Sequence, residues 1–412
     1  MKHSIALAGL SAFAIAGSAA VMAASSPEPH AHANCAHVSS ARPRALMSEE
    51  SKTWPASEKA AQFVKDSIVI DFFATPHGVG WNKPEHLHGY FDRAVEAGIT
   101  GASATLAATY YTWEEFQAEL KVWRDTMLQR EDRFIFVNAV EDFQRAHEEG
   151  KYAVVWNSQT SSILNGDTGK ISSLAQMGLA SMQLVYNDTY RAGDGVISFY
   201  HGRDRGLTNY GRQMIDEMVK HGIVIDLSHT GRDTCEGIIA YMQEKHAGVP
   251  VIYSHSLPMG LYKDAPDASQ RGCYRNITDE QALAAAATGG LVSPTFTEWM
   301  MDGVWPDDIT PLQCAQMIDY YVKLLGADHV GIATDDMFTL EIIMGFVDAN
   351  PGAYDDDGYM IDAFKKGAAG CGELAKILPA ITDELWKMGY TDEDIRKVYG
   401  GNLLRVYGQV WK

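Results

Sequence analysis

The sequence predicts an α/β fold of the (β/α)8, TIM-like barrel type with a helical C-terminal extension. Short apolar runs typical of buried strands alternate with helical patterns along most of the chain. This alternation indicates a parallel sheet covered by helices. The number of repeats favours a closed barrel over an open doubly wound sheet. No G-x-G-x-x-G loop follows the first strand and no G-x-x-x-x-G-K-S/T motif occurs, so nothing supports a nucleotide cofactor.

Nine strand-like runs are expected for eight barrel positions, so one of them is an additional or edge strand. The runs are 67–74, 101–107, 134–139, 152–159, 181–186, 224–229, 251–256, 290–296 and 329–335. Helical patterns lie between most of them, for example at 112–129, 208–221, 233–244, 279–287 and 311–325. A first helix is expected at 57–65. Beyond Asp335, helical patterns at 360–388 and 391–406 predict an extension packed on the barrel rather than a separate domain.

The N-terminus has the pattern of a secretory signal peptide. A short basic start is followed by an Ala- and Gly-rich apolar stretch, and Val21-Met22-Ala23 fits a cleavage site. The expected organisation is a signal peptide at 1–23, a flexible leader at 24–56, and one barrel domain at 57–412 that includes the C-terminal helices. No other stretch is long and apolar enough to cross a membrane. The sequence therefore predicts a periplasmic protein without a membrane span after cleavage.

Composition narrows the classes of partner. The chain has 412 residues, of which 46% are hydrophobic, which allows a large core. Its formal net charge of -19 and the lack of a basic run argue against binding to nucleic acid or to an anionic membrane. The five cysteines include no C-x-x-C pair, so no redox motif or structural zinc site is indicated. Disulfides are permitted in an oxidising compartment, but the odd count leaves at least one thiol unpaired.

Two histidines at the ends of predicted strands are the first candidates for a functional site. The runs V-I-D-L-S-H and V-I-Y-S-H-S end near His229 and His255 and are separated by one predicted helix. Neighbouring parallel strands deliver such residues to the same rim of a sheet. Neutral imidazole is a common metal ligand, so the pair is a plausible half of a metal site. The alternative is two core histidines bonded to backbone carbonyls.

Other polar residues fall at the same predicted rim. They are Thr75, Gln159, Tyr186 and Asp335. Each of these residues could instead have a role in the fold alone. Gln159 or Asp335 could cap a helix, and Tyr186 could be a core aromatic residue whose hydroxyl reaches solvent. Barrel enzymes place their chemistry where strands end, so the convergence of these residues favours a site.

A set of motifs follows one another along the chain. They are G-L-T-N-Y-G at 206–211, the two histidine runs, R-N-I-T-D at 275–279, G-G-L-V at 289–292, H-V-G-I-A-T-D at 329–335 and G-G-N-L-L-R-V at 400–406. With these motifs the chain resembles the membrane (renal) dipeptidase family of zinc metallopeptidases. The resemblance implies a distorted barrel of the metallo-dependent hydrolase type, two zinc ions bridged by a glutamate, cleavage of dipeptides and dehydropeptides, and a possible homodimer.

The resemblance also implies roles for individual residues. His229 and His255 match the ligands of the second zinc. Arg275 matches the arginine that holds the substrate carboxylate, and its planar guanidinium suits that task. Asp335 matches the aspartate that acts as acid and base beside the metals. Tyr186 stands at the position of a substrate-binding histidine.

The chain departs from the family pattern at the first metal site. The strand V-I-D-F-F-A-T-P puts Phe73 and Thr75 at the positions of a histidine and an aspartate ligand, and Gln159 replaces the bridging glutamate. A neutral amide supplies no charge to offset the repulsion between two dications. A single divalent ion, zinc by family resemblance, is therefore expected at His229 and His255, with Gln159 or Asp335 as an additional ligand. His77 and Asp336 are alternative replacement ligands.

Two readings of function remain open. The first is an exported, metal-dependent, dipeptidase-like hydrolase that acts on dipeptides or small amide-containing acids. The alternative is a non-peptidase periplasmic enzyme or a metal-free binding protein that processes or matures a peptide-derived molecule such as a siderophore. The retained Arg275 and Asp335 favour the first reading, whereas the replaced ligands favour the second.

Overall fold

The structure is a computed structural model that describes residues 54–74, 92–107, 112–262, 275–297, 300, 309–335 and 374–411. These residues lie in one compact unit, Pro43–Lys412. Its strands are β1 (Ile70–Ala74), β2 (Gly101–Ala107), β3 (Phe134–Phe136), β4 (Tyr152–Ser158), β5 (Leu179–Gln183), β6 (Val224–Asp226), β7 (Val251–Tyr253) and β8 (Leu291–Val292).

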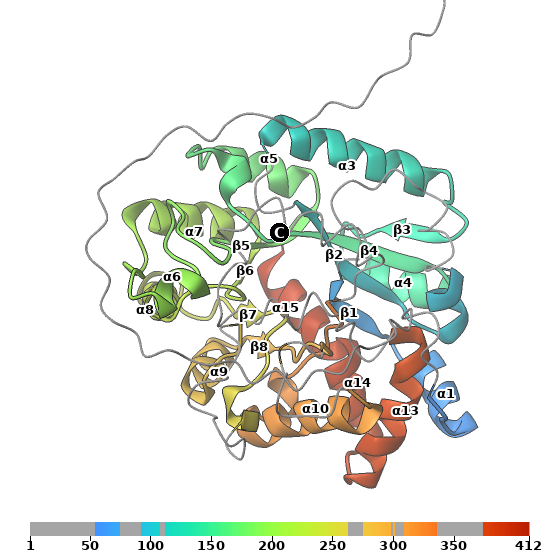
Figure 1. Ribbon diagram of the computed structural model, residues 1–412. Coiled ribbons are helices and arrows are strands. Elements are labelled where there is room, and N and C mark those ends of the chain that lie inside the picture. Colours follow the sequence, from blue (N-terminus) through green and yellow to red (C-terminus); the bar gives the residue numbers. More distant parts are fainter. Residues whose placement is uncertain are drawn as a thin grey trace, which may run out of the picture. The chain divides into compact units, whose positions relative to one another are not determined.

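The strands form a curled parallel sheet that closes into a barrel. They pair in the order β1-β2-β4-β5-β6-β7-β8, while β3 pairs with β4 outside this path. Figure 1 shows this ring of strands with helices around it. The segment 330–335 completes the ring, since Val330 is bridged to Val292 and the Phe72 amide donates to the Ile332 carbonyl oxygen over 2.9 Å. The predicted (β/α)8 barrel is therefore confirmed, with β3 as the additional strand.

Helices follow most of the strands. They are α1 (Glu58–Lys65), α3 (Trp113–Leu128), α4 (Glu141–Glu149), α5 (Lys170–Gln176), α6 (Val196–Tyr200), α7 (Asn209–His221), α8 (Arg232–Lys245), α9 (Asp279–Ala287), α10 (Pro311–Leu325), α13 (Leu374–Lys387), α14 (Asp392–Arg396) and α15 (Asn402–Val410). The helix expected at 391–406 is instead α14, a π-helical turn at Lys397–Gly401, and α15.

Threonine caps fix where several of these helices begin. At α3, the Thr112 hydroxyl accepts from the Glu115 amide, and the Glu115 carboxylate accepts from the Thr112 amide. Thr278 and Gln281 make the same reciprocal pair at α9. Each pair satisfies backbone donors that the first helical turn leaves free, and such caps contribute about 1 kcal/mol.

The apolar core has an outer layer and an inner layer. The outer layer lies between the strands and the surrounding helices, and Val154, Ile225 and Tyr253 belong to it. The inner layer fills the barrel with alternate residues of the same strands, such as Val155, Val224 and Ile252. This alternation follows from the two-residue period of a strand.

Helix α15 closes one end of the barrel. Its apolar side chains belong to the inner layer, together with residues from β1 and from β3 to β8. These helix residues are Leu403, Val406, Tyr407 and Val410. Figure 1 shows α15 behind the ring of strands. The contributing strand residues lie in the first half or at the middle of their strands. The opposite end, where the strands finish, is therefore the end available for a site.

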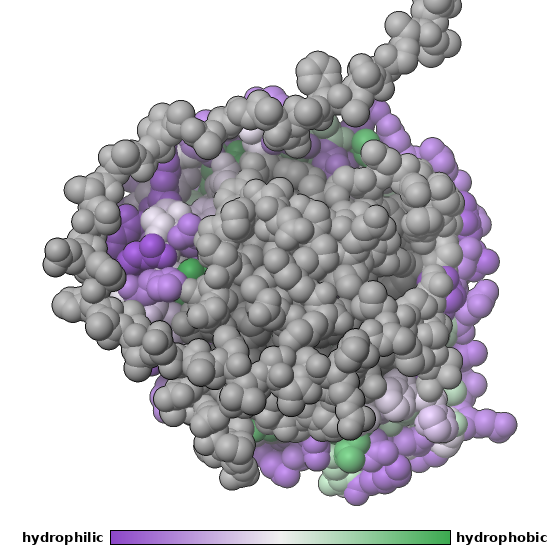
Figure 2. Space-filling view, in the orientation of Figure 1, coloured by the Kyte–Doolittle hydropathy of each residue, from purple (hydrophilic) through white to green (hydrophobic). Residues whose placement is uncertain are grey.

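The outer surface of the described residues is mainly polar. Figure 2 shows hydrophilic residues around the margin of the molecule, with apolar residues scattered among them. The most exposed large apolar side chains lie on separate helices: Val122 and Leu128 on α3, Leu283 on α9 and Leu312 on α10. Within the described part of the chain, no helix is both long enough and apolar enough to span a membrane.

Candidate metal and substrate site

Two buried aspartates shape the carboxyl ends of the strands. Asp226 ends β6 and accepts hydrogen bonds from the Ser228 amide, the Ser254 amide and the Ser254 hydroxyl, at 3.0, 3.1 and 2.5 Å. Asp71 in β1 accepts in the same way from the Phe73 amide and from the amide and hydroxyl of Thr334. The carboxylates therefore replace sheet bonds, and the runs predicted at 224–229 and 251–256 stop as strands after Asp226 and Tyr253.

This arrangement positions the residues that follow. Ser254 precedes His255, and Thr334 precedes Asp335, so each aspartate holds the residue next to a candidate functional side chain. Both aspartates end a V-I-D sequence, at 69–71 and 224–226. That repeat was a signal in the sequence that pointed to two equivalent strand ends.

His229 and His255 meet at this rim, as the sequence predicted. Their Nε2 atoms lie 3.0 Å apart, and both side chains are buried. The Nδ1 atom of His229 lies 2.6 Å from the Asn187 side-chain oxygen, and that of His255 lies 2.7 Å from the Ser254 hydroxyl. Each Nδ1 atom thus has a side-chain partner, in contrast to the alternative of core histidines bonded to backbone carbonyls.

The hydrogen-bond partners decide the tautomer of each ring. The Asn187 oxygen is an acceptor, so His229 carries its proton on Nδ1. The Ser254 hydroxyl donates its one proton to Asp226, so it accepts from Nδ1 of His255. Each Nε2 therefore presents a lone pair toward the other. Two lone pairs at 3.0 Å repel unless a cation lies between them, and neutral imidazoles held in this way are suited to bind a metal ion.

The environment favours the neutral form of both rings. Burial, and then the positive charge of Arg275, lower the pKa of His229 and of His255 well below the usual value for histidine. Each therefore keeps its Nε2 lone pair at neutral pH.

An aromatic ring covers one face of each histidine. Phe73 stacks on His255 with ring centroids 3.7 Å apart, and Tyr186 stacks on His229 at 3.9 Å. Phe73 is the residue predicted to replace a metal-binding histidine, and its phenyl ring packs on His255 and offers no ligand atom. Among the described residues, no group of three or more histidine, cysteine, aspartate or glutamate side chains is close enough to hold a metal ion.

Arg275 is a buried cation beside the histidines. It is 1% exposed, and its Nη2 donates to the His255 carbonyl oxygen over 2.9 Å. Its Nε and Nη1 have no hydrogen-bond partner within the described ranges. A buried charge normally has a paired anion. The unused donors therefore suit an anionic group supplied by a ligand.

The remaining predicted residues lie at the same rim, or outside the described part of the chain. Asp335 has a left-handed backbone (φ 51°), as His229 does (φ 66°), and its amide donates to the Phe73 carbonyl oxygen over 3.0 Å. Strain of this kind persists where the surrounding structure holds it. Gln159 directly follows β4 and is half-buried. Thr75, His77 and Asp336 lie outside the described residues.

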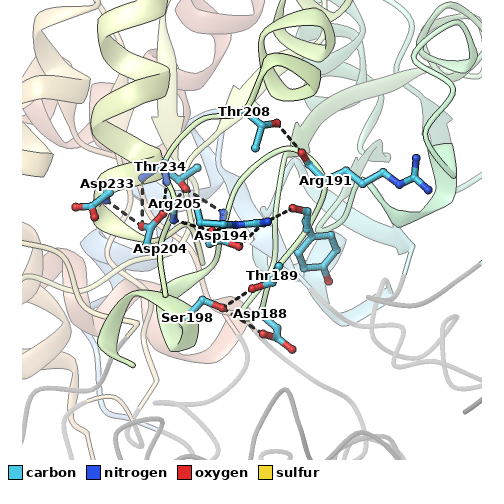
Figure 3. A network of polar contacts seen from close by, with 12 residues as sticks. Asp188, Thr189, Arg191, Asp194, Ser198, Asp204, Arg205, Thr208, Asp233 and Thr234 are labelled. Atoms are coloured by element: carbon cyan, nitrogen blue, oxygen red, sulfur yellow. Dashed lines mark hydrogen bonds and ion pairs between the residues drawn. The ribbon is translucent and has the colours of Figure 1, made fainter. Parts of the chain in front are cut away.

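A polar network fixes the loop that carries Tyr186 and Asn187 against α8 (Figure 3). The buried Asp194 carboxylate accepts from the backbone amide, Nε and Nη2 of Arg205, at 2.8, 2.8 and 2.9 Å. The Asp194 amide donates to the Thr234 hydroxyl of α8. The loop also reaches the site directly, since the Val196 amide donates to the His229 carbonyl oxygen over 2.9 Å.

The Asp204 side chain caps the N-terminus of α8, a role that the residue just before a helix usually performs. Its Oδ2 accepts from the amides of Asp233 and Thr234, at 3.0 and 3.2 Å. The usual capping position is Gly231, and a Cβ there would lie 2.3 Å from that same oxygen. Glycine therefore makes room for a cap from 27 residues earlier in the chain, which ties the loop to the helix that follows His229.

Sequence reasoning missed three supporting residues. Asn187 and Ser254 hydrogen-bond to the histidines and Asp226 holds Ser254, and these supporting roles follow no metal-ligand motif. Asn187 directly follows the predicted Tyr186, and Ser254 directly precedes His255. Adjacency to a candidate residue was the available signal.

Known proteins resemble this chain in sequence and in fold. The family model for membrane dipeptidase (peptidase family M19) matches residues 65–350. Dipeptidase ataJ of Aspergillus terreus is 27% identical over 190 residues, which cover 46% of this chain and 37% of that protein. The match thus spans little more than a third of that curated relative.

Solved structures extend the likeness over most of the chain. An amidohydrolase from Pseudomonas aeruginosa superposes with a TM-score of 0.70 and 27% identity, covering 85% of this chain and 99% of that one. The probable dipeptidase PvdM from Pseudomonas aeruginosa gives a TM-score of 0.66 at 19% identity, covering 86% and 98%. Because the family model matches well over half of the sequence, this chain belongs to the membrane dipeptidase family, peptidase family M19.

Proposed function

We propose that the protein is an exported, dipeptidase-like, metal-dependent hydrolase that acts on dipeptides or small amide-containing acids with one divalent ion, by family resemblance zinc. The observation that carries the proposal is the convergence of two Nε2 lone pairs beside a buried arginine with unused donors. Family membership supports the reaction class.

The residues present fit one cation better than two. Zinc–nitrogen bonds of about 2.0–2.1 Å at a tetrahedral angle place two nitrogens roughly 3.3 Å apart. The observed 3.0 Å between the histidine Nε2 atoms is close to that value. Phe73 and Gln159 supply no negative charge to hold a second dication nearby. When bound, the ion supplies a Lewis acid, and Gln159 is the candidate for an additional ligand.

The chain's own residues would perform the other tasks. Arg275 would bind the substrate carboxylate through Nε and Nη1, because these donors are buried and unpaired. Asp335 would accept a proton from the attacking water, and its strained backbone is held at the rim by its bond to Phe73. Tyr186 would contact the substrate from the face of His229 that it covers.

Replacement of Asp335 tests the hydrolytic role. Asp335→Asn keeps the size of the side chain but removes the base, so kcat for dipeptide hydrolysis should fall about 100-fold or more. Zinc content and the melting temperature should stay near wild type. Wild-type kcat in a folded, metal-loaded Asp335→Asn protein would rule out this role.

A second candidate role is favoured by the aromatic cover on the histidines. Phe73 and Tyr186 each stack within 4 Å of an imidazole, an arrangement that also suits a ligand which is bound but not hydrolysed. In that case the protein would be a non-peptidase enzyme or a metal-free binding protein for a peptide-derived molecule such as a siderophore. Tight dipeptide binding without hydrolysis, in protein that contains no metal, would favour this role.

Export belongs to the same proposal. The pattern at 1–23 supports a cleaved signal peptide and a periplasmic location. Determining the N-terminus of the protein recovered from the periplasmic fraction tests it. A mature chain that begins at Ala24 or Ser25 is expected, and full-length protein confined to the cytoplasm would contradict it.

A further inference from the structure

The segments that follow β7 and β8, together with Arg275 and Asn276, carry buried polar atoms that have no hydrogen-bond partner among the described residues. We call this set of atoms the hydroxyl cluster. It consists of the hydroxyls of Ser256, Ser293, Thr295 and Thr297, the Asn276 side-chain oxygen, and Nε and Nη1 of Arg275. Every one of these residues is at most 4% exposed.

The cluster has a definite place in the barrel. Ser293, Thr295 and Thr297 continue the alternation that begins with Leu291, which belongs to the inner layer of the core. A Cβ added to Gly331, on the strand segment beside β8, would lie 2.5 Å from the Ser293 hydroxyl. The hydroxyls thus extend from the apolar interior of the barrel toward the rim where the strands end.

The neighbouring strand brings Ser256 and Arg275 to the same region. The Ser256 amide donates to the Ser293 carbonyl oxygen over 3.0 Å, which joins the segment after β7 to the segment after β8. Arg275 donates to the carbonyl oxygen of His255, the residue before Ser256. The cluster is therefore continuous with the candidate site.

Unpaired buried hydroxyls are rare, because each one loses its hydrogen bonds to water and gains none in exchange. Elsewhere in this protein a buried threonine is satisfied. The fully buried Thr382 donates to the Leu378 carbonyl oxygen and also lies 2.8 Å from the Tyr399 hydroxyl. Among the described residues, several unpaired groups at one rim, together with an arginine that has unused donors, suit a site that binds a polar ligand.

We propose that the hydroxyl cluster is a subsite for a short polar side chain, an amide or a hydroxyl, on the residue whose carboxylate Arg275 binds. The inference rests on the proposed function and adds a substrate class to it. The cluster offers hydroxyls that donate and accept, and an Asn276 oxygen that accepts. An asparagine side chain can both accept hydrogen bonds from the donors and donate hydrogen bonds to the acceptors of the cluster. A leucine side chain of almost the same shape would leave all of them unpaired.

Binding of two dipeptides of matched shape tests the proposal. Titration calorimetry of Ala-Asn and Ala-Leu, in the metal-loaded Asp335→Asn protein to prevent turnover, should show at least tenfold tighter binding of Ala-Asn. Adding Thr295→Val and Thr297→Val removes two hydroxyls without a large change in volume and should abolish that preference. Adding Thr382→Val instead should leave the preference intact, because Thr382 lies outside the site.

The melting temperature of the ligand-free protein is a second measurement. It distinguishes a hydroxyl kept for a ligand from one that stabilises the fold. Thr295→Val removes an unpaired hydroxyl, so the melting temperature of the ligand-free protein should stay level or rise. Thr382→Val removes satisfied hydrogen bonds, so the melting temperature should fall.

The outcomes separate this inference from the proposed function. If both dipeptides bind with equal affinity and Arg275→Met abolishes their binding, the hydroxyl cluster is no subsite, although the proposed function survives. If neither dipeptide binds, both ideas are overturned. If Thr295→Val lowers the melting temperature as much as Thr382→Val, the hydroxyl is already satisfied by water and the inference also fails.

Discussion

Each candidate histidine is held in place by two kinds of contact. A hydrogen bond at Nδ1 fixes the tautomer, and an aromatic ring fixes the plane of the imidazole. Asn187 does the first task for His229 from the loop after β5. Residues that hold a ligand in this way commonly affect metal affinity 10- to 100-fold.

Replacement of Asn187 therefore tests the tautomer argument. Asn187→Leu removes the acceptor at nearly constant shape, so zinc affinity measured against a competing chelator should fall about 10- to 100-fold. Asn187→Asp keeps an acceptor and should retain most of the affinity. Equal zinc affinity in all three proteins would show that Nδ1 of His229 needs no partner.

Cys235 gives a prediction on pH. Burial raises the pKa of its thiol from 9.0 to about 12. Between these values the unfolded chain ionises this thiol while the folded chain does not, so stability is lost as the pH rises above 9. Between pH 8 and pH 10, the unfolding free energy of wild type should fall by about 1.4 kcal/mol relative to that of Cys235→Ala. Denaturant titrations at both pH values measure this change. If the two proteins differ in unfolding free energy by the same amount at pH 8 and pH 10, the pKa of the Cys235 thiol is not raised in the folded state.

Among the elements, α15 packs directly on the inner layer of the barrel. Its apolar side chains fill the end opposite the site, in one cluster with residues from seven strands. The role of α15 is therefore packing, since its apolar side chains cover the interior of the barrel at this end.

Truncation of a leucine measures that packing. Leu403 is fully buried, so Leu403→Ala should lower the unfolding free energy by about 2–5 kcal/mol. Leu312→Ala on α10 is the matched control, because that leucine is 44% exposed, and its cost should stay below about 1 kcal/mol. Denaturant unfolding of both variants makes the comparison. Equal losses would mean that α15 does not seal the core.

The helices were predicted more accurately than the strands. The expected helix at 311–325 and the helix at 279–287 have the bounds of α10 and α9, because caps and amphipathic periods are local signals. The run expected at 290–296 is a regular strand only at Leu291–Val292, and 329–335 pairs through isolated bridges. Side-chain carboxylates end or replace sheet pairing at the rim, and that competition depends on distant residues.

For the molecule as a whole, the barrel and the meeting of His229 with His255 could be predicted, since both follow from the repeated strand pattern and one rim. The stacking of Phe73 and Tyr186 on the histidines could not, because it depends on how side chains from different strand ends pack against one another. The unpaired hydroxyls of the hydroxyl cluster were also out of reach, because a serine or threonine in a strand gives no sign of whether its hydroxyl will find a partner.

One cation held between His229 and His255 is the central feature of the proposed site. The most direct test is the metal content of the purified mature protein, measured by elemental mass spectrometry, in wild type, His229→Ala and His246→Ala. His246 lies at the surface next to Asp216 and serves as the control. About one equivalent of divalent metal is expected in wild type and in His246→Ala, and almost none in a folded His229→Ala. Two equivalents in wild type, or one that persists in His229→Ala, would contradict the account.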